Sequence, residues 1–243
     1  MLILLADLCH PSVAKRKLRT LANDPVCILA WKAGKSLDSL WRGTWLNHLW
    51  SEFQLARRGY LGFLAARPAD SLPPDCADLW FLYRLIRARR PNTVLELGSG
   101  FSTVIMAYAL RENGGGMMWS IDADERWMGV TQSLLPKSLT PHCRILHCPA
   151  KAEDWRGYRV WRHAGLPEVT PDFLYVDGPG GDEGRTPAIT ADPLDLEPKF
   201  PLGFIMVIDG RYATYAFLKT HLQRRYRFTE RPRFSNYLIS LIA

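Results

Sequence analysis

A short apolar segment followed by two glycines constrains this chain more than any other stretch of its 243 residues. Residues Thr93–Leu97 form an apolar run that begins with β-branched side chains and is interrupted only by Glu96. A run of this length that ends at glycine is typical of a buried strand in a parallel sheet. Gly98 and Gly100 allow backbone angles and close approaches that a Cβ atom would block. The segment therefore predicts a central parallel strand and a tight turn.

A helix is predicted directly after this turn. Ser102 and Thr103 carry the side chains that cap helices, and we expect the helix over residues 104–111. Such a turn presents backbone N–H groups and the positive end of a helix at the carboxyl edge of a sheet, where nucleotide-like ligands bind. Thr103 stands where a dinucleotide-binding fingerprint needs its third glycine, which disfavours a nicotinamide oxidoreductase. A strand, turn and helix without any ligand is the other alternative.

Strands and helices alternate after this turn, which is typical of an α/β fold with a mainly parallel sheet. The connection between the last two predicted strands is too short for a helical crossover, so these two should be antiparallel. We expect residues 153–155 to lie in a helix or a loop. The six further strands are predicted at residues 117–121, 143–147, 172–176, 204–208, 226–229 and 236–242.

Four of the predicted parallel strands carry a carboxylate within the strand or directly after it. These acids are Glu96, Asp122, Asp177 and Asp209. The carboxyl ends of parallel strands meet at one edge of a sheet, and ligands bind at that edge. Carboxylates are not needed there to build a core. Their order, with the glycine turn first, therefore predicts a ligand site.

These motifs resemble those of class I S-adenosylmethionine (SAM) methyltransferases from about residue 92 to the end of the chain. Residues 96–103 resemble the first motif, residues 120–124 the ribose-binding motif and residues 173–179 the fourth-strand motif. Together with residues 184–188 and 207–211, they are similar to small-molecule and glycan O-methyltransferases, among them the plant glucuronoxylan methyltransferases. The resemblance implies a Rossmann-like sheet of seven strands with a terminal antiparallel hairpin. The break at residues 70–75, after which a helix is predicted, divides the chain into a helical N-terminal extension or cap, residues 1–74, and a SAM-binding domain, residues 75–243.

The same resemblance assigns roles in cofactor binding. The two glycines of the turn would let the backbone approach the amino-acid part of SAM, with help from Glu96. Asp122 would bind the ribose hydroxyls, and Ala150, next to Lys151, would lie close to the adenine. The full set of implied cofactor-binding residues is Glu96, Gly98, Ser99, Gly100, Ser102, Thr103, Asp122, Ala150 and Asp177.

The implied reaction is methylation of a hydroxyl oxygen by direct displacement, on a sugar-containing or other small polar acceptor. The residues implied in catalysis are Asp177, Asp209 and Arg185. Asp177 would remove the hydroxyl proton, and Mg²⁺ held by Asp177 and Asp209 is the alternative. Gly210 stands where metal-dependent relatives carry a further ligand, so no metal site is assigned. Arg185 and Arg211 are open to two interpretations, an anionic group of the acceptor or salt bridges within loops.

The basic charge of the chain is concentrated before the first predicted strand. Residues 1–90 hold 14 of the 31 Lys and Arg but only 7 of the 24 Asp and Glu. Between residues 37 and 53, Leu, Trp and Phe recur at helical spacing. This pattern is open to several interpretations, namely helix packing, a cap over a site, or a helix on a membrane surface. The alternatives for function are therefore a nucleic-acid or protein methyltransferase, or a non-catalytic SAM-binding module that a membrane recruits.

Other features of the sequence limit the cellular compartment and the kinds of partner that we expect. Five cysteines without C-x-x-C spacing favour reduced thiols and a cytoplasmic location. Two His-Cys steps, at residues 142–143 and 147–148, lack a usual zinc spacing. The opening apolar stretch is interrupted by Asp7, so it makes a poor signal peptide. We expect a small-molecule or glycan acceptor and no nucleic acid, with peripheral membrane contact through the N-terminal helices as an open alternative and the oligomeric state undetermined.

Overall fold

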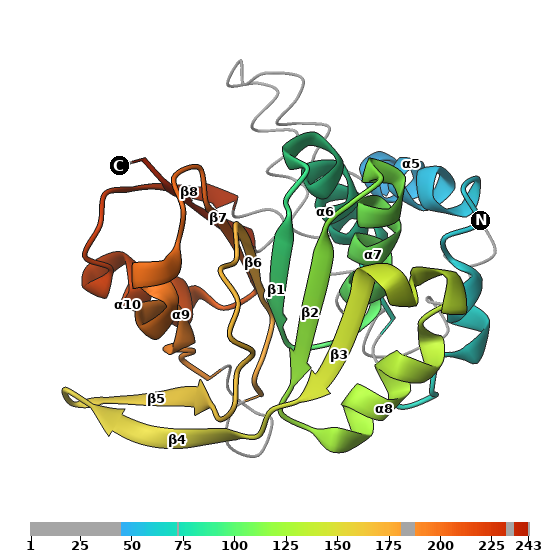
Figure 1. Ribbon diagram of the computed structural model, residues 1–243. Coiled ribbons are helices and arrows are strands. Elements are labelled where there is room, and N and C mark those ends of the chain that lie inside the picture. The colour runs from blue at the N-terminus through green and yellow to red at the C-terminus, as the bar shows by residue number, and fades with distance from the viewer. Residues whose placement is uncertain (1–44, 72, 181–187, 232–235, 243) are drawn as a thin grey trace. The chain divides into compact units, whose positions relative to one another are not determined.

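A computed structural model describes residues 45–71, 73–180, 188–231 and 236–242 (Figure 1). The helices predicted before residue 45 lie outside these ranges. The chain divides into two compact units, Met1–Phe81 and Leu82–Ala243. The predicted site residues all belong to the second unit.

The described part of the first unit is helical. It comprises α5 (Trp45–Ala56), the 3₁₀ helix η1 (Gly62–Ala66) and the first residues of α6 (Cys76–Arg89). Leu55 and Phe63 are buried, whereas Trp50 and Phe53 keep 47% and 54% of their exposure. Phe53 belongs to the apolar repeat seen in the sequence, so part of that repeat lies on the surface and not in the core. No helix in the described ranges is both long and apolar enough to cross a bilayer.

The second unit is built on a mixed sheet of seven strands (Figure 1). β7 and β8 each pair antiparallel with β9, and the other neighbours are parallel. The predicted α/β class, the seven strands and the terminal antiparallel pair are therefore confirmed. In sheet order the strands are β3 (Cys143–His147), β2 (Met117–Asp122), β1 (Thr93–Leu97), β6 (Phe173–Val176), β7 (Ile205–Asp209), β9 (Asn236–Leu241) and β8 (Tyr226–Arg231).

The core lies along the three central strands, β1, β6 and β7. Nearly all of their side chains are buried, because helices cover a parallel sheet on both faces. α7 lies along β2, and α8 lies along β3. The helices in the described part of this unit are the end of α6, α7 (Phe101–Asn113), α8 (Glu125–Leu134), η2 (Lys137–His142), α9 (Asp192–Leu196), η4 (Glu197–Lys199) and α10 (Tyr212–His221).

Helix α7 begins earlier than the sequence predicts. Ser102 and Thr103 lie inside its first turn, and Gly100 occupies the capping position. The predicted start at residue 104 was therefore too late. Thr103 does contribute to the cap, because its hydroxyl accepts from the backbone N–H of Gly100 at 2.9 Å, and the hydroxyls of Ser102 and Thr103 also donate to the buried Glu96. Glycine can take the N-cap position without a side-chain bond.

A hairpin occupies the chain between β3 and β6 (Figure 1). It consists of β4 (Ala150–Trp155) and β5 (Tyr158–His163), so the prediction of a helix or loop at residues 153–155 was wrong. Arg156 and Gly157 form the two-residue turn, with φ of 54° and 81°. Turns with positive φ at both positions suit a tight hairpin, but Asn-Gly and not Arg-Gly is their usual sequence signal. The rings of Trp155 and Tyr158 pack edge-on against Phe217 of α10.

Candidate active site at the carboxyl edge of the sheet

The structure brings the four predicted acids to neighbouring strands. Glu96, Asp122 and Asp209 are residues of β1, β2 and β7, and Asp177 directly follows β6. These strands are adjacent in the order β2, β1, β6, β7. The carboxyl edge of the sheet therefore carries all four acids.

The turn after β1 packs backbone against backbone with the turn after β6. Gly98 has a φ of +99°, and a Cβ placed on it would lie 2.5 Å from the amide nitrogen of Gly178. The N–H of Gly178 donates to the carbonyl oxygen of Leu97 at 2.6 Å, and the following Gly178–Pro179 peptide is cis. A Cβ at Gly100, by contrast, would meet no atom of the described residues within 4 Å. Gly98 is thus required by the fold, whereas the space at Gly100 is open for a ligand.

Glu96 is fully buried beneath this turn. Its carboxylate accepts hydrogen bonds from the hydroxyls of Ser102, Thr103 and Ser120. Burial raises the pKa of Glu96 to about 7, although the three hydroxyl donors oppose the rise. Glu96 therefore ties β1 to the first turn of α7 and to β2. Ser102 and Thr103 can offer a ligand their backbone N–H groups, since both hydroxyls are engaged.

Asp122 fastens the glycine turn to β2. Its Oδ2 accepts from the backbone N–H of Ser99 at 3.0 Å and from the Ser99 hydroxyl at 2.6 Å. Its Oδ1 accepts from the N–H of Asp124 at 2.9 Å. A carboxylate has about four acceptor positions, so Asp122 keeps capacity for a further donor. Such a donor could be one hydroxyl of a ribose.

The Asp177 carboxyl lies near a second acid and a buried guanidinium. It is open to solvent on one side, with 48% of its side chain exposed. The surrounding protein atoms, and then Asp209, raise the pKa of Asp177 well above its ordinary value, while Arg211 opposes the rise. Asp209 accepts a hydrogen bond from the hydroxyl of Tyr175 at 3.0 Å. Of the two acids, Asp177 is therefore the stronger candidate for accepting a proton from a substrate.

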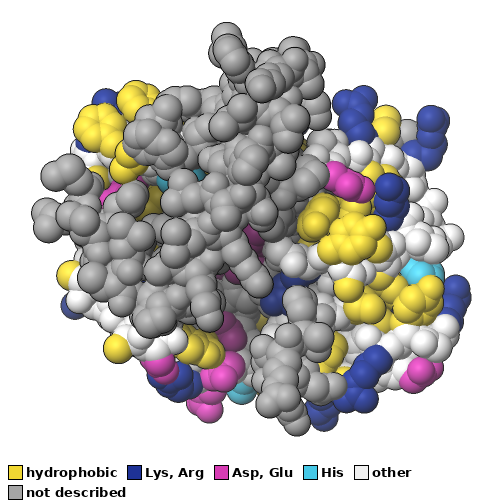
Figure 2. Space-filling model, turned by 180° about the vertical axis from the view of Figure 1, so that it is seen from behind, with side chains coloured by type: hydrophobic (Ala, Val, Ile, Leu, Met, Phe, Trp, Pro, Cys, Tyr) yellow, Lys and Arg dark blue, Asp and Glu magenta, His cyan; other side chains and the backbone are white. Residues whose placement is uncertain are grey.

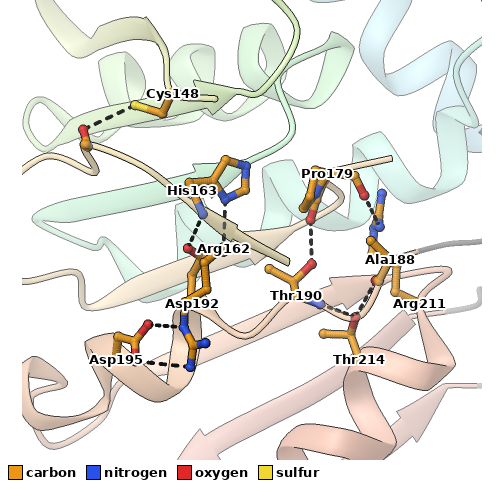
Figure 3. A network of polar contacts seen from close by, with 12 residues as sticks. Cys148, Arg162, His163, Pro179, Ala188, Thr190, Asp192, Asp195, Arg211 and Thr214 are labelled. Atoms are coloured by element: carbon orange, nitrogen blue, oxygen red, sulfur yellow. Dashed lines mark hydrogen bonds and ion pairs between the residues drawn. The ribbon is translucent and has the colours of Figure 1, made fainter. Parts of the chain in front are cut away.

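Arg211 holds the turn that carries Asp177 (Figure 3). One of its terminal nitrogens donates to the carbonyl oxygen of Pro179 at 2.6 Å, and the other donates to the carbonyl oxygen of Asp177. Thr190 supports the same turn, because its hydroxyl donates to the carbonyl oxygen of Gly178 at 2.8 Å. Of the two interpretations of Arg211, this geometry favours a role within the protein. No sequence signal pointed to Thr190.

Among the residues that the structure describes, those near Asp177 do not fit a Mg²⁺ ion. Mg²⁺ prefers several oxygen ligands in octahedral geometry, and Gly210 offers no side chain next to Asp209. The Nε of Arg211 lies 4.0 Å from Oδ1 of Asp177, where it supplies the positive charge itself. Within the described ranges, no three His, Cys, Asp or Glu side chains form a metal-binding group.

The remaining predicted residues have different positions. Ala150 is the first residue of β4 and pairs with His163 of β5. Arg185 lies outside the described residues. The two His-Cys steps are engaged in the fold, since His142 and His147 contact the backbone carbonyls of Gly116 and Ala123, and Cys143 and Cys148 are buried thiols.

The coloured surface in Figure 2 bears on the nucleic-acid alternative. On this face, the Lys and Arg side chains are scattered among hydrophobic and acidic ones. A protein that binds nucleic acid usually gathers its positive charge in a patch or stripe. The described residues on this face form no such patch.

Comparisons with known proteins agree with the fold. No family model and no curated protein matches the sequence. Among solved structures, an SAH-bound methyltransferase from Podospora anserina aligns with a TM-score of 0.56 at 13% identity, covering 80% of this chain and 93% of its own. Two O-methyltransferases align with lower scores. One is from Bacillus cereus, in complex with SAH, with a TM-score of 0.47, 14% identity and coverage of 79% and 91%. The other, from Streptomyces achromogenes in complex with SAM, has a TM-score of 0.49, 13% identity and coverage of 80% and 95%. The alignment with the Podospora anserina structure, together with the sheet topology, shows a Rossmann-like methyltransferase fold.

Proposed function

We propose that this protein is a SAM-dependent methyltransferase that methylates a hydroxyl group of a small polar acceptor, with a sugar-containing molecule as one such acceptor. The observation that carries the proposal is the carboxyl edge, where a glycine turn is flanked by Asp122 on one side and Asp177 on the other. The fold shared with an SAH-bound methyltransferase supports the same assignment.

The residues of β1 and β2 fit the cofactor. The open space at Gly100 and the N-terminus of α7 can receive the amino-acid part of SAM. Asp122 can accept one ribose hydroxyl, while its bonds to Ser99 fix the turn. Bound SAM supplies the methyl group as an electrophile on its sulfonium. The protein then has to align the donor and the acceptor, which is worth several orders of magnitude in rate.

The residues of β6 and β7 fit the acceptor. Asp177 is exposed and has a raised pKa, so it can take the proton that the acceptor hydroxyl loses as the new O–C bond forms. Asp209 and Arg211 surround it, and Arg211 fixes its backbone. We infer that the guanidinium takes the place of a metal ion, so cofactor binding should not require Mg²⁺.

Calorimetry of S-adenosylhomocysteine binding tests the proposal. Wild-type protein should bind with a micromolar Kd, equally with Mg²⁺ and with a chelator. Asp122→Asn should weaken binding about tenfold or more, since a carboxylate acceptor of the ribose is lost. Asp154→Asn, an exposed acid near the hairpin turn, is the matched control and should bind as wild type does. Absence of binding by the folded wild-type protein would refute the proposal.

A second candidate concerns membrane contact through α5. Trp50 and Phe53 are exposed with ring centroids 5.9 Å apart, and the guanidinium of Arg57 lies 5.9 Å from the Phe53 ring. Arg57 directly follows α5, and aromatic side chains of a helix with a basic side chain at its end suit the surface of an anionic membrane. Flotation with phosphatidylserine vesicles should therefore bring the full chain to the top fraction, and Trp50→Ser with Phe53→Ser should leave it at the bottom. Wild-type protein that stays at the bottom would contradict this candidate.

A further inference from the structure

One donor group of the Arg211 side chain is buried and unpaired within the described part of the chain. The two terminal nitrogens of the guanidinium donate to the carbonyl oxygens of Pro179 and Asp177 (Figure 3). Nε is also buried, but no described residue accepts a hydrogen bond from it. Buried polar atoms are nearly always paired. The Nε–H group therefore indicates a hydrogen bond that another conformation of its surroundings completes.

The carboxylate of Asp177 lies within reach of this donor. Its Oδ1 is 4.0 Å from Nε of Arg211. A hydrogen bond between two such charged groups is shorter by about 1 Å. The Asp177 side chain keeps 48% of its exposure, whereas the Arg211 side chain keeps 11%. Of the two groups, the carboxylate therefore has the greater freedom to move.

The guanidinium is fixed by the turn to which it donates. The backbone N–H groups of Asp177 and Gly178 both donate to the carbonyl oxygen of Leu97, at 2.8 and 2.6 Å. Gly98 packs so closely against Gly178 that a Cβ would not fit between them. The carbonyl oxygens that Arg211 binds are therefore held in place, and the guanidinium with them. Rotation of the Asp177 side chain is then the movement that brings Oδ1 to Nε.

We propose that Arg211 is a positioning residue for Asp177: its Nε–H donates to Oδ1 of the ionised carboxyl group and leaves Oδ2 facing the acceptor hydroxyl. The role of Asp177 as a base rests on the proposed function. Hydrogen bonds between charged groups are roughly twice as strong as neutral ones, so the ionised carboxylate is drawn to the guanidinium. When Oδ2 binds the proton, the hydroxyl oxygen keeps the electron pair of the O–H bond. The carboxyl group is then neutral, and its attraction to Arg211 weakens.

The charges around Asp177 give this contact its importance. The surrounding protein atoms, and then Asp209 of β7, raise the pKa of Asp177, and Glu96 of β1 and Asp122 of β2 add to the rise. Arg211 is the group that opposes it. Without the guanidinium, the pKa of Asp177 would rise further, and a larger share of the molecules would carry a carboxyl group that already holds a proton. Such a group cannot accept a second proton from a substrate.

Nuclear magnetic resonance of the full chain, labelled with ¹⁵N and ¹³C, tests the contact directly. A scalar correlation between Nε of Arg211 and Cγ of Asp177 is transmitted through a hydrogen bond and is not expected at the 4.0 Å separation. It should be present in wild type where Asp177 is ionised, and it should disappear as the pH is lowered through the titration of that carboxyl group. Asp177→Ala removes the acceptor and should abolish it. A folded wild type without the correlation at any pH would overturn the proposal.

The titration of the Asp177 carboxyl group separates positioning from a purely structural role. Arg211→Gln should raise its midpoint, followed by the ¹³C shift of Cγ, by about one pH unit or more, since a hydrogen bond between charges is lost. Arg162→Gln is the matched control, because Arg162 pairs with Glu153 and Asp195, and it should keep the wild-type midpoint. An unchanged midpoint in Arg211→Gln would show that Arg211 only fixes the backbone of the turn.

Calorimetry with S-adenosylhomocysteine keeps this inference apart from the proposed function. Wild type that shows the correlation but does not bind S-adenosylhomocysteine would overturn the proposed function, and with it the role of Asp177 as a base. Wild type that binds the compound but lacks the correlation would overturn the role of Arg211 alone. Thermal melting identifies the variants that fold. If Arg211→Gln does not fold, the correlation in wild type and its loss in Asp177→Ala decide the question.

Discussion

The carboxylates in the two halves of the carboxyl edge differ in burial and in the groups that contact them. On the β1–β2 side, Glu96 and Asp122 are buried and accept hydrogen bonds from hydroxyls and backbone N–H groups. On the β6–β7 side, Asp177 is exposed, and its neighbours are Asp209 and the guanidinium of Arg211. Neutral donors hold the first pair of acids, whereas charges surround the second.

This difference separates acids that fix the backbone from an acid that can react with a substrate. Acids that accept several short-range hydrogen bonds fix the backbone around a turn. The protein atoms around Asp177, and then the neighbouring Asp209, raise its pKa, and an acid with a raised pKa that solvent can reach is suited to exchange a proton. The β1–β2 side is therefore suited to bind a cofactor, and the β6–β7 side is suited to act on an acceptor. Three changes test how far the two sides depend on each other.

The largest effect is expected where the two sides touch. Gly98→Ala would place a Cβ 2.5 Å from the backbone of Gly178 at a φ of +99°. We expect it to lower the free energy of unfolding by about 4 kcal/mol, from backbone strain and overpacking together. Gly100→Ala, whose Cβ would meet no atom of the described residues within 4 Å, should change it by less than about 1 kcal/mol. Urea unfolding measures both. Equal effects would show that the two turns do not constrain each other.

The next largest effect is a dependence of stability on pH, and it tests the β1–β2 side alone. The Glu96 carboxyl has a pKa of about 7 in the folded protein against an ordinary value of 4.5. Between these values the folded state holds a proton that the unfolded state has lost. The stabilisation is therefore full below pH 4.5 and is lost as the pH rises toward 7, by about 3 kcal/mol.

Glu96→Gln has no such proton to lose. Measured by urea unfolding from pH 4 to pH 8, the stability of wild type relative to this variant should fall across that window. Glu125→Gln, an exposed glutamate in the first turn of α8, serves as the control and should parallel wild type. A constant difference between wild type and Glu96→Gln would contradict the raised pKa.

The smallest expected loss of stability tests the β6–β7 side alone. Arg211→Gln removes the donors to the carbonyls of Asp177 and Pro179, and we expect a loss of about 2 kcal/mol of stability. Tyr175→Phe removes the hydroxyl that donates to Asp209 and should cost about 1 kcal/mol. Chemical denaturation of the two variants side by side measures the difference. If Arg211→Gln were as stable as wild type, Arg211 would not fix the turn and would be free for the anionic acceptor group considered from the sequence.

Much of the fold followed from local patterns. The apolar run at Thr93–Leu97, the glycines after it and the acids that end later strands predicted the parallel sheet, since buried strands and tight turns leave strong local signals. The hairpin at residues 150–163 was missed, because Arg156-Gly157 is an unusual turn sequence. The start of α7 was also missed, because Ser102 and Thr103 lie inside its first turn, where their hydroxyls donate to a buried acid in β1 and that of Thr103 also accepts from the N–H of Gly100.

The sequence by itself determined the order of the strands along the chain, the glycine turn and the four acids that belong to the carboxyl edge, because each depends on residues close together in the chain. Only the tertiary structure decided what each acid contacts. Arg211 meets Asp177 across 34 residues, and His163 meets Asp192 across 29. Such partners are set by how the strands and helices pack, and no local pattern carries that information.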